Sequence, residues 1–269
     1  MHARAILTVE RVGDRSVVRE LRSQSPLSLV PRRGTAAAYD SAVTVHLVGS
    51  ASTPLPGDDV ELDVRVDPGA DLVLTGVAAA VALAGPSTLT MRFAIDEAAS
   101  VQYLPEPTVI TARADHHTLF HAELHESARL RAREVLVAGR ANEPSGRYRG
   151  TTRLTQGHTP LLHQTQDLGD PVLQASPAHL AGRRVLGTEV LLWGPDGEAA
   201  AGEWWSLTPL ARRGSLATAV GPDAVSTQRA LADAVAAHPG WTRQTLHESA
   251  VRADLPHESA VRANAEEVP

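Results

Sequence analysis

Strand-like segments recur in this chain with a spacing of 29 residues. Ala70, Ala99 and Ala128 close three short turns that are 29 residues apart, and the segments before these turns keep the same register. Equivalent positions are Leu62, Met91 and Phe120 in one row, and Val64, Phe93 and Ala122 in another. A fixed period in this range is typical of stacked repeat units. The sequence therefore favours units of strand, tight turn, strand and longer return over a closed β-sandwich.

Alternation within these segments predicts strands with one buried and one solvated face. Apolar and charged side chains alternate in residues 60–67, and a similar pattern returns in residues 89–95. In residues 128–133, the predicted solvated side consists of Arg129, Arg131 and Arg133. Further strands are expected at residues 5–10, 43–48, 184–193 and 203–207, with a turn at residues 194–197.

One segment has a clear helical pattern, at residues 223–237, and His238-Pro239-Gly240 ends it. We therefore predict a mostly all-β fold, a solenoid-like superhelix of stacked β-hairpins with one or two short helices. One β domain is expected over residues 1–245, followed by a polar tail at residues 246–269. This tail contains the segment HESAVRA twice, ten residues apart, and we expect it to be disordered.

Composition excludes several classes of function. A formal net charge of −6 argues against a nucleic-acid-binding protein, which normally has a basic face. The chain has no cysteine, and all 25 of its basic residues are arginine. Thiolate chemistry, Schiff-base chemistry and a lysine-containing phosphate loop are therefore excluded. We find neither a secretory signal nor an apolar run of about 18 residues, so we expect a cytoplasmic protein without a membrane span.

Two acidic residues occur where a core or loop would not need them. Glu106 lies between Pro105 and Pro107, each of which fixes φ and lacks a backbone N–H. Glu134 lies on the predicted apolar side of residues 128–138. An unpaired buried carboxylate costs several kcal/mol, so Glu134 should be paired, hydrogen-bonded, protonated or facing a wet cavity. Arg140 and Arg113 are plausible partners, and a structural ion pair is an open alternative to a functional site.

The repeat predicts different positions for the two acids. In the 29-residue register, Pro105 and Glu134 are equivalent, and strict alternation then places Glu106 on the opposite face unless the prolines turn it. Glu134 is the better candidate for an interior route, and Glu106 for a rigid rim or a partner contact. Asp58, which follows Pro56-Gly57 at a strand entry, is a third candidate, although a solvated turn explains it equally well.

The histidines give no clear metal site. His117, His121 and His125 recur at every fourth residue, which on a helix would place them on one face that could bind a metal ion. The repeat instead makes this segment a strand, along which the three would spread over roughly 25 Å. A solvated strand face is the better interpretation. No nucleophile motif occurs, so we predict no catalytic residue.

Five segments, in their order and spacing, resemble the UreD (UreH) family of urease accessory proteins. They are residues 45–48 (VHLV), 55–58 (LPGD), 67–72 (DPGADL), 103–109 (YLPEPTV) and 134–140 (EVLVAGR). The resemblance covers about residues 3–240, and the tail after Leu246 lies outside it. Two departures occur: Pro56-Gly57-Asp58 stands where many members have Gly-Gly-Asp, and Thr75-Gly76 lacks the polar residue that often follows the threonine.

The resemblance implies a non-catalytic maturation factor with a mostly-β superhelical fold and an internal passage for metal. Members of the family bind the urease apoprotein and, with UreF and the GTPase UreG, assist nickel insertion into the urease active site. By matched position, Glu134, Glu106 and Asp58 are candidates for a transient nickel path. Pro105, Pro107 and Arg140 are candidates for structural or partner contacts. No tightly bound cofactor is expected.

Two other functions are compatible with the residues. The first is an unrelated β-solenoid binding module that shares only the repeat. The second is an enzyme in which Glu106 and Glu134 act as an acid pair on a small polar substrate. The enzyme would need both carboxylates to converge in a closed pocket, about 5–10 Å apart for glycosidic chemistry.

Overall fold

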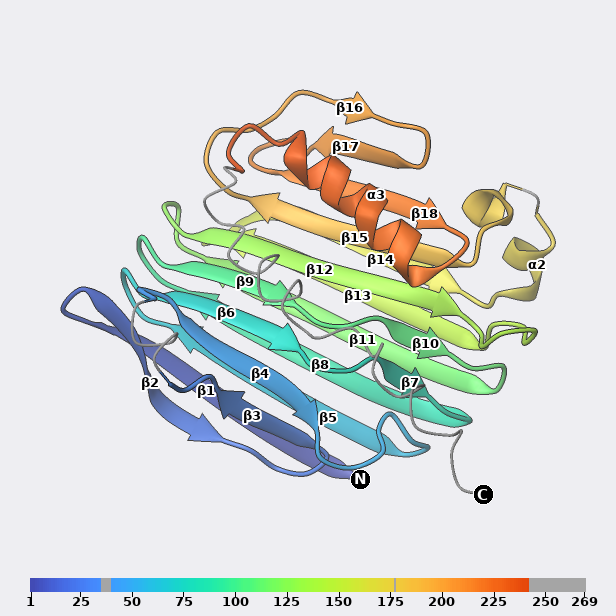
Figure 1. The fold of residues 1–269 in the computed structure, drawn as a ribbon, viewed down its shortest axis with the longest axis horizontal. Coiled ribbons are helices and arrows are strands. Elements are labelled where there is room, and N and C mark those ends of the chain that lie inside the picture. Colours follow the sequence, from blue (N-terminus) through green and yellow to red (C-terminus); the bar gives the residue numbers. More distant parts are fainter. Residues whose placement is uncertain (35–39, 177, 242–269) are drawn as a thin grey trace, which may run out of the picture.

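Two β-sheets face each other in the computed structural model, which describes residues 1–34, 40–176 and 178–241 (Figure 1). Strands make up 56% of the described residues and helices 9%, and the strands are stacked as in a β-solenoid. This arrangement confirms the predicted mostly-β superhelix. The predicted tail at residues 246–269 lies outside the described residues. Within the described part of the chain, no helix has the length and apolar character needed to cross a membrane.

One sheet has seven strands and the other has eleven. In spatial order, the seven-stranded sheet contains β14 (Thr159–Leu168), β13 (Arg147–Gln156), β11 (Ala114–Leu124), β8 (Gly85–Ile95), β5 (Asp58–Val66), β1 (His2–Val12) and β2 (Arg15–Arg22). The eleven-stranded sheet contains β16 (Ala200–Ala201), β17 (Trp205–Pro209), β18 (Ser215–Gly221), β15 (Val185–Leu192), β12 (Arg129–Ala138), β9 (Ser100–Leu104), β6 (Asp71–Gly76), β4 (Val43–Gly49) and β3 (Leu27–Pro31), and beside them β10 (Thr108–Ile110) and β7 (Ala80–Ala82). The helical segments are α2 (Pro171–Gln174), η1 (His179–Gly182) and α3 (Ala224–Ala236).

Each predicted repeat unit contributes one strand to each sheet. Leu62 of β5 pairs with Met91 of β8, and Met91 pairs with Phe120 of β11, in parallel strands. The second strands of the units, β6, β9 and β12, also pair in parallel, with Ser100 between Asp71 and Arg129. The predicted 29-residue register is therefore confirmed in both sheets.

The turns between the two sheets repeat the same hydrogen bond. In each turn the final alanine N–H donates to the carbonyl three residues earlier, at 3.1 Å for Ala70, 3.2 Å for Ala99 and 3.1 Å for Ala128. The residue before the alanine has a left-handed φ in the first two turns, +67° at Gly69 and +54° at Ala98. The common turn geometry explains why the spacing between the two strands of each unit stays constant.

The main hydrophobic core fills the space between the sheets. Its aromatic centre consists of Phe93, Tyr103 and Phe120, whose ring centroids lie 5.0–5.6 Å apart. The other core positions are mostly Leu, Val and Ala from alternate positions of the strands. This alternation confirms the predicted buried face of each strand.

The helix α3 lies over the outer face of the eleven-stranded sheet, along β15 and β18 (Figure 1). Asp223 caps its first turn by accepting a hydrogen bond from Ser226 N at 2.8 Å, so the predicted helix is confirmed. Leu231 and Val235 of α3 pack with Val135 of β12 in a second apolar cluster. One central strand, β12, is therefore covered on both faces.

The coverage of β12 corrects the prediction that Arg131 is solvated. Arg131 is buried, and its Nε donates a hydrogen bond to the buried carboxylate of Glu189 on β15. Its guanidinium lies 4.3 Å from the ring centroid of Trp241. Alternation predicted a wet face here because the residues that cover it come from a distant part of the chain.

The 29-residue register is interrupted at the link between β9 and β10 and returns where Gly85 pairs with Ala114. Thr75 pairs with Leu104, a spacing of 29, whereas Ala80 pairs with Thr108, a spacing of 28. The same change occurs between this link and β12. The alternation of faces is therefore not carried unchanged across the Pro105–Pro107 segment.

Gly76 allows the close approach of this link, and we expect Gly76→Ala to destabilise the protein. A Cβ at Gly76 would lie 2.6 Å from the backbone nitrogen of Glu106, so the Pro-Glu-Pro segment would have to move. Overpacking of this kind typically costs about 1–3 kcal/mol of unfolding free energy. At Gly49 an added Cβ meets its nearest neighbour, Ala51 O, at 3.7 Å, so Gly49→Ala should change stability by at most about 0.5 kcal/mol. Urea denaturation of both variants measures the difference, and equal stabilities would contradict the prediction.

Candidate functional site

A cavity of about 580 Å³ lies between the two sheets. Apolar side chains from β5, β8, β11 and β12 form much of its wall, and Asp58, Glu106, His116 and Glu134 also line it. All three acids predicted from the sequence therefore reach the same cavity.

Glu134 is held by hydrogen bonds from the opposite sheet. Tyr148 Oη on β13 donates to Glu134 Oε1 at 2.5 Å, and Thr118 Oγ1 on β11 lies 3.5 Å from the same oxygen. Thr118 Oγ1 and Tyr148 Oη are themselves 2.6 Å apart. Burial raises the pKa of Glu134, and the hydrogen bonds from Tyr148 and Thr118 partly oppose this increase. Glu134 is thus hydrogen-bonded and faces a cavity, which were two of the outcomes expected for it.

Arg140 does not pair with Glu134, so the expectation of that ion pair is wrong. Arg140 is exposed in the turn after β12, where its Nε lies 2.7 Å from Glu143 Oε2 and its Nη2 lies 3.0 Å from Glu143 Oε1. The hydrogen bonds from Arg140 lower the pKa of Glu143 to about 2. Arg140 therefore stabilises a surface turn. Arg113, the other expected partner, is also exposed.

Glu106 lines the same cavity as Glu134, so strict alternation does not hold across the two prolines, which is the exception allowed for in the prediction. The one-residue change of register at the Pro-Glu-Pro link shifts the alternation and brings Glu106 to the cavity wall. The two prolines hold this link through their carbonyl groups. Pro105 O accepts a hydrogen bond from Arg133 Nη2 at 3.4 Å, and Pro107 O accepts one from Ala80 N at 2.9 Å.

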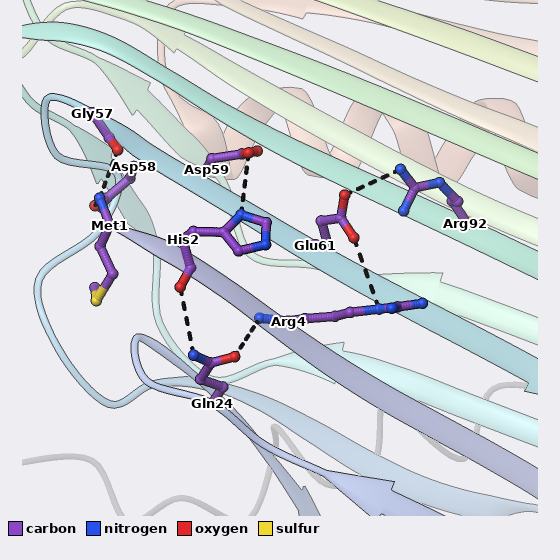
Figure 2. A network of polar contacts seen from close by, with 9 residues as sticks. All are labelled: Met1, His2, Arg4, Gln24, Gly57, Asp58, Asp59, Glu61 and Arg92. Carbon is purple, nitrogen blue, oxygen red and sulfur yellow. Dashed lines mark hydrogen bonds and ion pairs between the residues drawn. The ribbon is translucent and has the colours of Figure 1, made fainter.

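Asp58 is buried at the entry of β5, which corrects its interpretation as part of a solvated turn. Its Oδ2 accepts hydrogen bonds from Leu55 N at 2.9 Å and Thr53 Oγ1 at 3.0 Å, and its Oδ1 lies 3.2 Å from the ammonium group of Met1. Burial disfavours the charged carboxylate, but these hydrogen bonds outweigh it and lower the pKa of Asp58. Figure 2 shows Met1 and Gly57 beside Asp58, so this acid also anchors the first strand.

A row of polar residues crosses the inner face of the seven-stranded sheet, and sequence reasoning missed most of it. Asp58, Ser87 and His116 are register partners on β5, β8 and β11, and Tyr148 on β13 is the next partner. Ser87 Oγ lies 2.9 Å from His116 Nδ1. The first three residues are 29 apart, so the repeat itself contained the signal: a polar residue at the same position in three consecutive units.

Comparison with known proteins identifies the family of this chain. The family model described as UreD urease accessory protein matches residues 1–262. The chain belongs to the UreD family. It is 50% identical over 245 residues to Urease accessory protein UreD 1 of Saccharopolyspora erythraea, which covers 89% of this chain and 96% of that protein. It is 40% identical over 262 residues to Urease accessory protein UreD of Parafrankia sp., covering 86% of each.

Membership of the UreD family confirms the resemblance predicted from the five segments and excludes an unrelated solenoid. The match extends to residue 262, so the prediction that the resemblance ends near residue 240 is wrong. The duplicated HESAVRA segments, which begin at residues 247 and 257, lie largely within the matched range.

The acids of this UreD-family cavity do not form a metal cluster. Within residues 1–34, 40–176 and 178–241, no group of three or more His, Asp or Glu side chains is arranged to hold a metal ion. His117 on β11 is exposed, and its Nε2 lies 3.3 Å from Asp115 Oδ1. His125, just after the strand, is also exposed, as predicted for a solvated face. Asp58, Glu106 and Glu134 therefore line one cavity without belonging to such a group of three among the described residues.

His116 should make the stability of this UreD-family chain depend on pH. Burial lowers the pKa of His116 to about 4, and the nearby charge of His117 acts in the same direction. In the unfolded chain, His116 binds a proton below its usual pKa of 6.5, whereas in the folded chain it stays neutral down to about pH 4. The free energy of unfolding should therefore be highest above pH 6.5 and fall as the pH drops toward 4. The loss should be about 3 kcal/mol in total.

Comparison with His116→Gln isolates this contribution from that of Glu134, whose raised pKa has the opposite effect on the pH dependence. Urea denaturation between pH 4.5 and 7.5 measures the free energy of unfolding of the original chain and of the variant. The stability difference between the original chain and the variant should shrink as the pH falls, and a constant difference would contradict the prediction.

Proposed function

We propose that this chain is a non-catalytic urease maturation protein that binds apo-urease and assists nickel delivery together with UreF and the GTPase UreG. In this proposal the nickel ion is cargo that passes through the cavity between the two sheets, in the cytoplasm. The observation that carries the proposal is a cavity in which Glu134 is held by a hydrogen bond from Tyr148 and which Asp58 and Glu106 also line.

The distribution of the acids supports transport rather than storage. A tight nickel site would need several ligands converging on one point, and thiolates would hold the ion strongly. The chain has no cysteine, and among the described residues no three His, Asp or Glu side chains are arranged to hold one metal ion. An ion that meets one carboxylate or imidazole at a time is bound weakly at each step and can move on.

No catalytic role is assigned to Glu106 and Glu134 in this proposal. The family is one of accessory proteins, and Oε1 of Glu134 already accepts a hydrogen bond from Tyr148. The chain also lacks lysine and therefore a lysine-containing phosphate loop, which agrees with GTP hydrolysis by a partner protein.

Co-purification tests the proposed partners. The tagged chain should retain purified apo-urease on an affinity column, and adding UreF and UreG should yield a larger complex by size-exclusion chromatography. The same column loaded with nickel-containing urease gives the control for preference toward the apoprotein. Failure to retain apo-urease in the presence of UreF and UreG would contradict the proposed function.

A further inference from the structure

Among the described residues, His116 is the only histidine that lines the cavity, and the acids of the proposed nickel path do not include it. It lies on β11 with its side chain turned inward, and it is 2% exposed. The next residue, His117, is exposed on the outer face of the same strand. An imidazole that is buried beside a cavity has the chemistry of a metal ligand if one ring nitrogen is free to bind.

The contacts of His116 with Ser87 favour a lone pair on the other ring nitrogen. Burial lowers the pKa of His116 to about 4, so the ring is neutral near pH 7. Ser87 Oγ lies 2.9 Å from Nδ1, and a hydrogen bond with the Ser87 backbone opposes the effect of burial, as expected when Nδ1–H donates to the carbonyl. A neutral ring with its hydrogen on Nδ1 has its lone pair on Nε2. Metal-binding histidines are usually oriented in this way, by a protein acceptor on the nitrogen away from the metal.

The second ring nitrogen, Nε2, borders the open space of the cavity. It makes no hydrogen bond with a described residue, and it is not among the fully buried nitrogen and oxygen atoms that lack a partner. Because His116 lines the cavity and its Nδ1 faces Ser87, Nε2 is the ring nitrogen that an ion in the cavity can reach.

His116 lies between two of the acids that line the cavity. Asp58, Ser87 and His116 are register partners on three neighbouring strands, so the backbones of Asp58 and His116 are roughly 10 Å apart. On the other side, the ring centroids of His116 and Tyr148 lie 6.1 Å apart, and Tyr148 Oη donates to Glu134. An ion that moves from Asp58 to Glu134 along this face of the sheet therefore passes His116.

We propose that Nε2 of His116 binds the metal ion between Asp58 and Glu134 and makes the path selective for nickel over magnesium. Carboxylates suit Mg²⁺ well, whereas imidazole suits Ni²⁺ and other late first-row metal ions. Mg²⁺ also gives up its water ligands reluctantly, so a step on a single imidazole excludes it. The identity of the ion as nickel rests on the proposed function, but the ligand role of His116 is measured on this chain alone.

Nitrogen NMR of the His116 ring tests the proposal without a substitution. In the metal-free chain, the ring spectrum should show the hydrogen on Nδ1 and the lone pair on Nε2. Added Ni²⁺ should broaden the His116 ring signals, and excess Mg²⁺ should not restore them. A hydrogen on Nε2, His116 signals that Ni²⁺ leaves unchanged, or recovery of the signals in Mg²⁺ would overturn the proposal.

His116→Asn separates metal binding from the contact with Ser87. The shorter amide keeps a polar group near Ser87 but has no atom at the position of Nε2. The backbone amide of Tyr148, the next register partner, reports on the ion, and its broadening should require at least about tenfold more Ni²⁺ in this variant. The control His117→Asn removes an exposed imidazole from the same strand and should leave the required Ni²⁺ unchanged. Equal requirements for His116→Asn and the original chain would overturn the proposal.

Urease loading separates this inference from the proposed function. With limiting nickel and excess magnesium, urease co-expressed with His116→Asn should contain less nickel than urease co-expressed with the original chain. If the original chain does not affect the nickel content of urease although Ni²⁺ broadens the His116 signals, the proposed function fails and the metal site stands. Loading that falls in Glu134→Ala but not in His116→Asn refutes the role of His116 alone.

Discussion

Glu134→Ala should lower the nickel content of co-expressed urease by roughly tenfold or more when nickel is limiting, while this protein stays folded. Glu134 is held at the cavity from the opposite sheet, since Tyr148 and Thr118 both contact its Oε1. The fold should survive because Tyr148 Oη keeps Thr118 Oγ1 as a partner at 2.6 Å when the carboxylate is removed. The measurement is nickel per urease active site, by atomic emission, together with urease activity.

Glu134→Gln separates a ligand role from a structural one. Glutamine keeps an oxygen that accepts the Tyr148 hydrogen bond, but it has no negative charge and is a poor nickel ligand. If the carboxylate contacts the passing ion, Glu134→Gln should lose nearly as much nickel loading as Glu134→Ala. The control is Glu123→Ala, which removes an exposed acid from β11 and should leave loading unchanged. Full loading by Glu134→Gln would show that the residue serves the fold alone.

Arg131→Ala should destabilise the protein by about 3–5 kcal/mol, because it leaves the carboxylate of Glu189 buried without its cation. The side chains of this pair are 10% and 2% exposed. Arg131 also approaches Gln102 Oε1 at 3.4 Å and stacks on Trp241, so its loss removes packing as well as charge. Chemical denaturation gives the free energy of unfolding for the variant and the original chain.

The exposed pair Arg149–Asp167 is the matched control. Arg149 Nε and Asp167 Oδ1 lie 2.7 Å apart, but the side chains are 60% and 36% exposed, so Arg149→Ala should lower the stability far less than Arg131→Ala does. The double substitution Arg131→Met with Glu189→Leu should recover much of the stability, since it removes both buried charges together. Similar losses at Arg131 and Arg149 would refute this account of the buried pair.

The repeat made most of the fold predictable, because register partners such as Leu62 and Met91 lie one period apart in the sequence. The same period could have revealed Ser87 and His116 as equivalents of Asp58. Tyr148 could not be found in this way, because it follows His116 by 32 residues rather than 29.

Other features depended on contacts that a local pattern does not contain. The position of Glu106 depends on a one-residue change of register across two prolines, which alternation alone does not predict. Arg131 seemed solvated because Glu189 and Trp241, which bury it, lie far along the chain.

The most direct test of the proposed function is the nickel content of urease from cells that lack this protein. Urease purified from such cells, grown with limiting nickel, should be nickel-poor and largely inactive. Supplying the original chain should restore nickel, whereas supplying Glu134→Ala should restore little of it. Urease with the same nickel content in the presence and absence of this protein would contradict its proposed role in urease maturation.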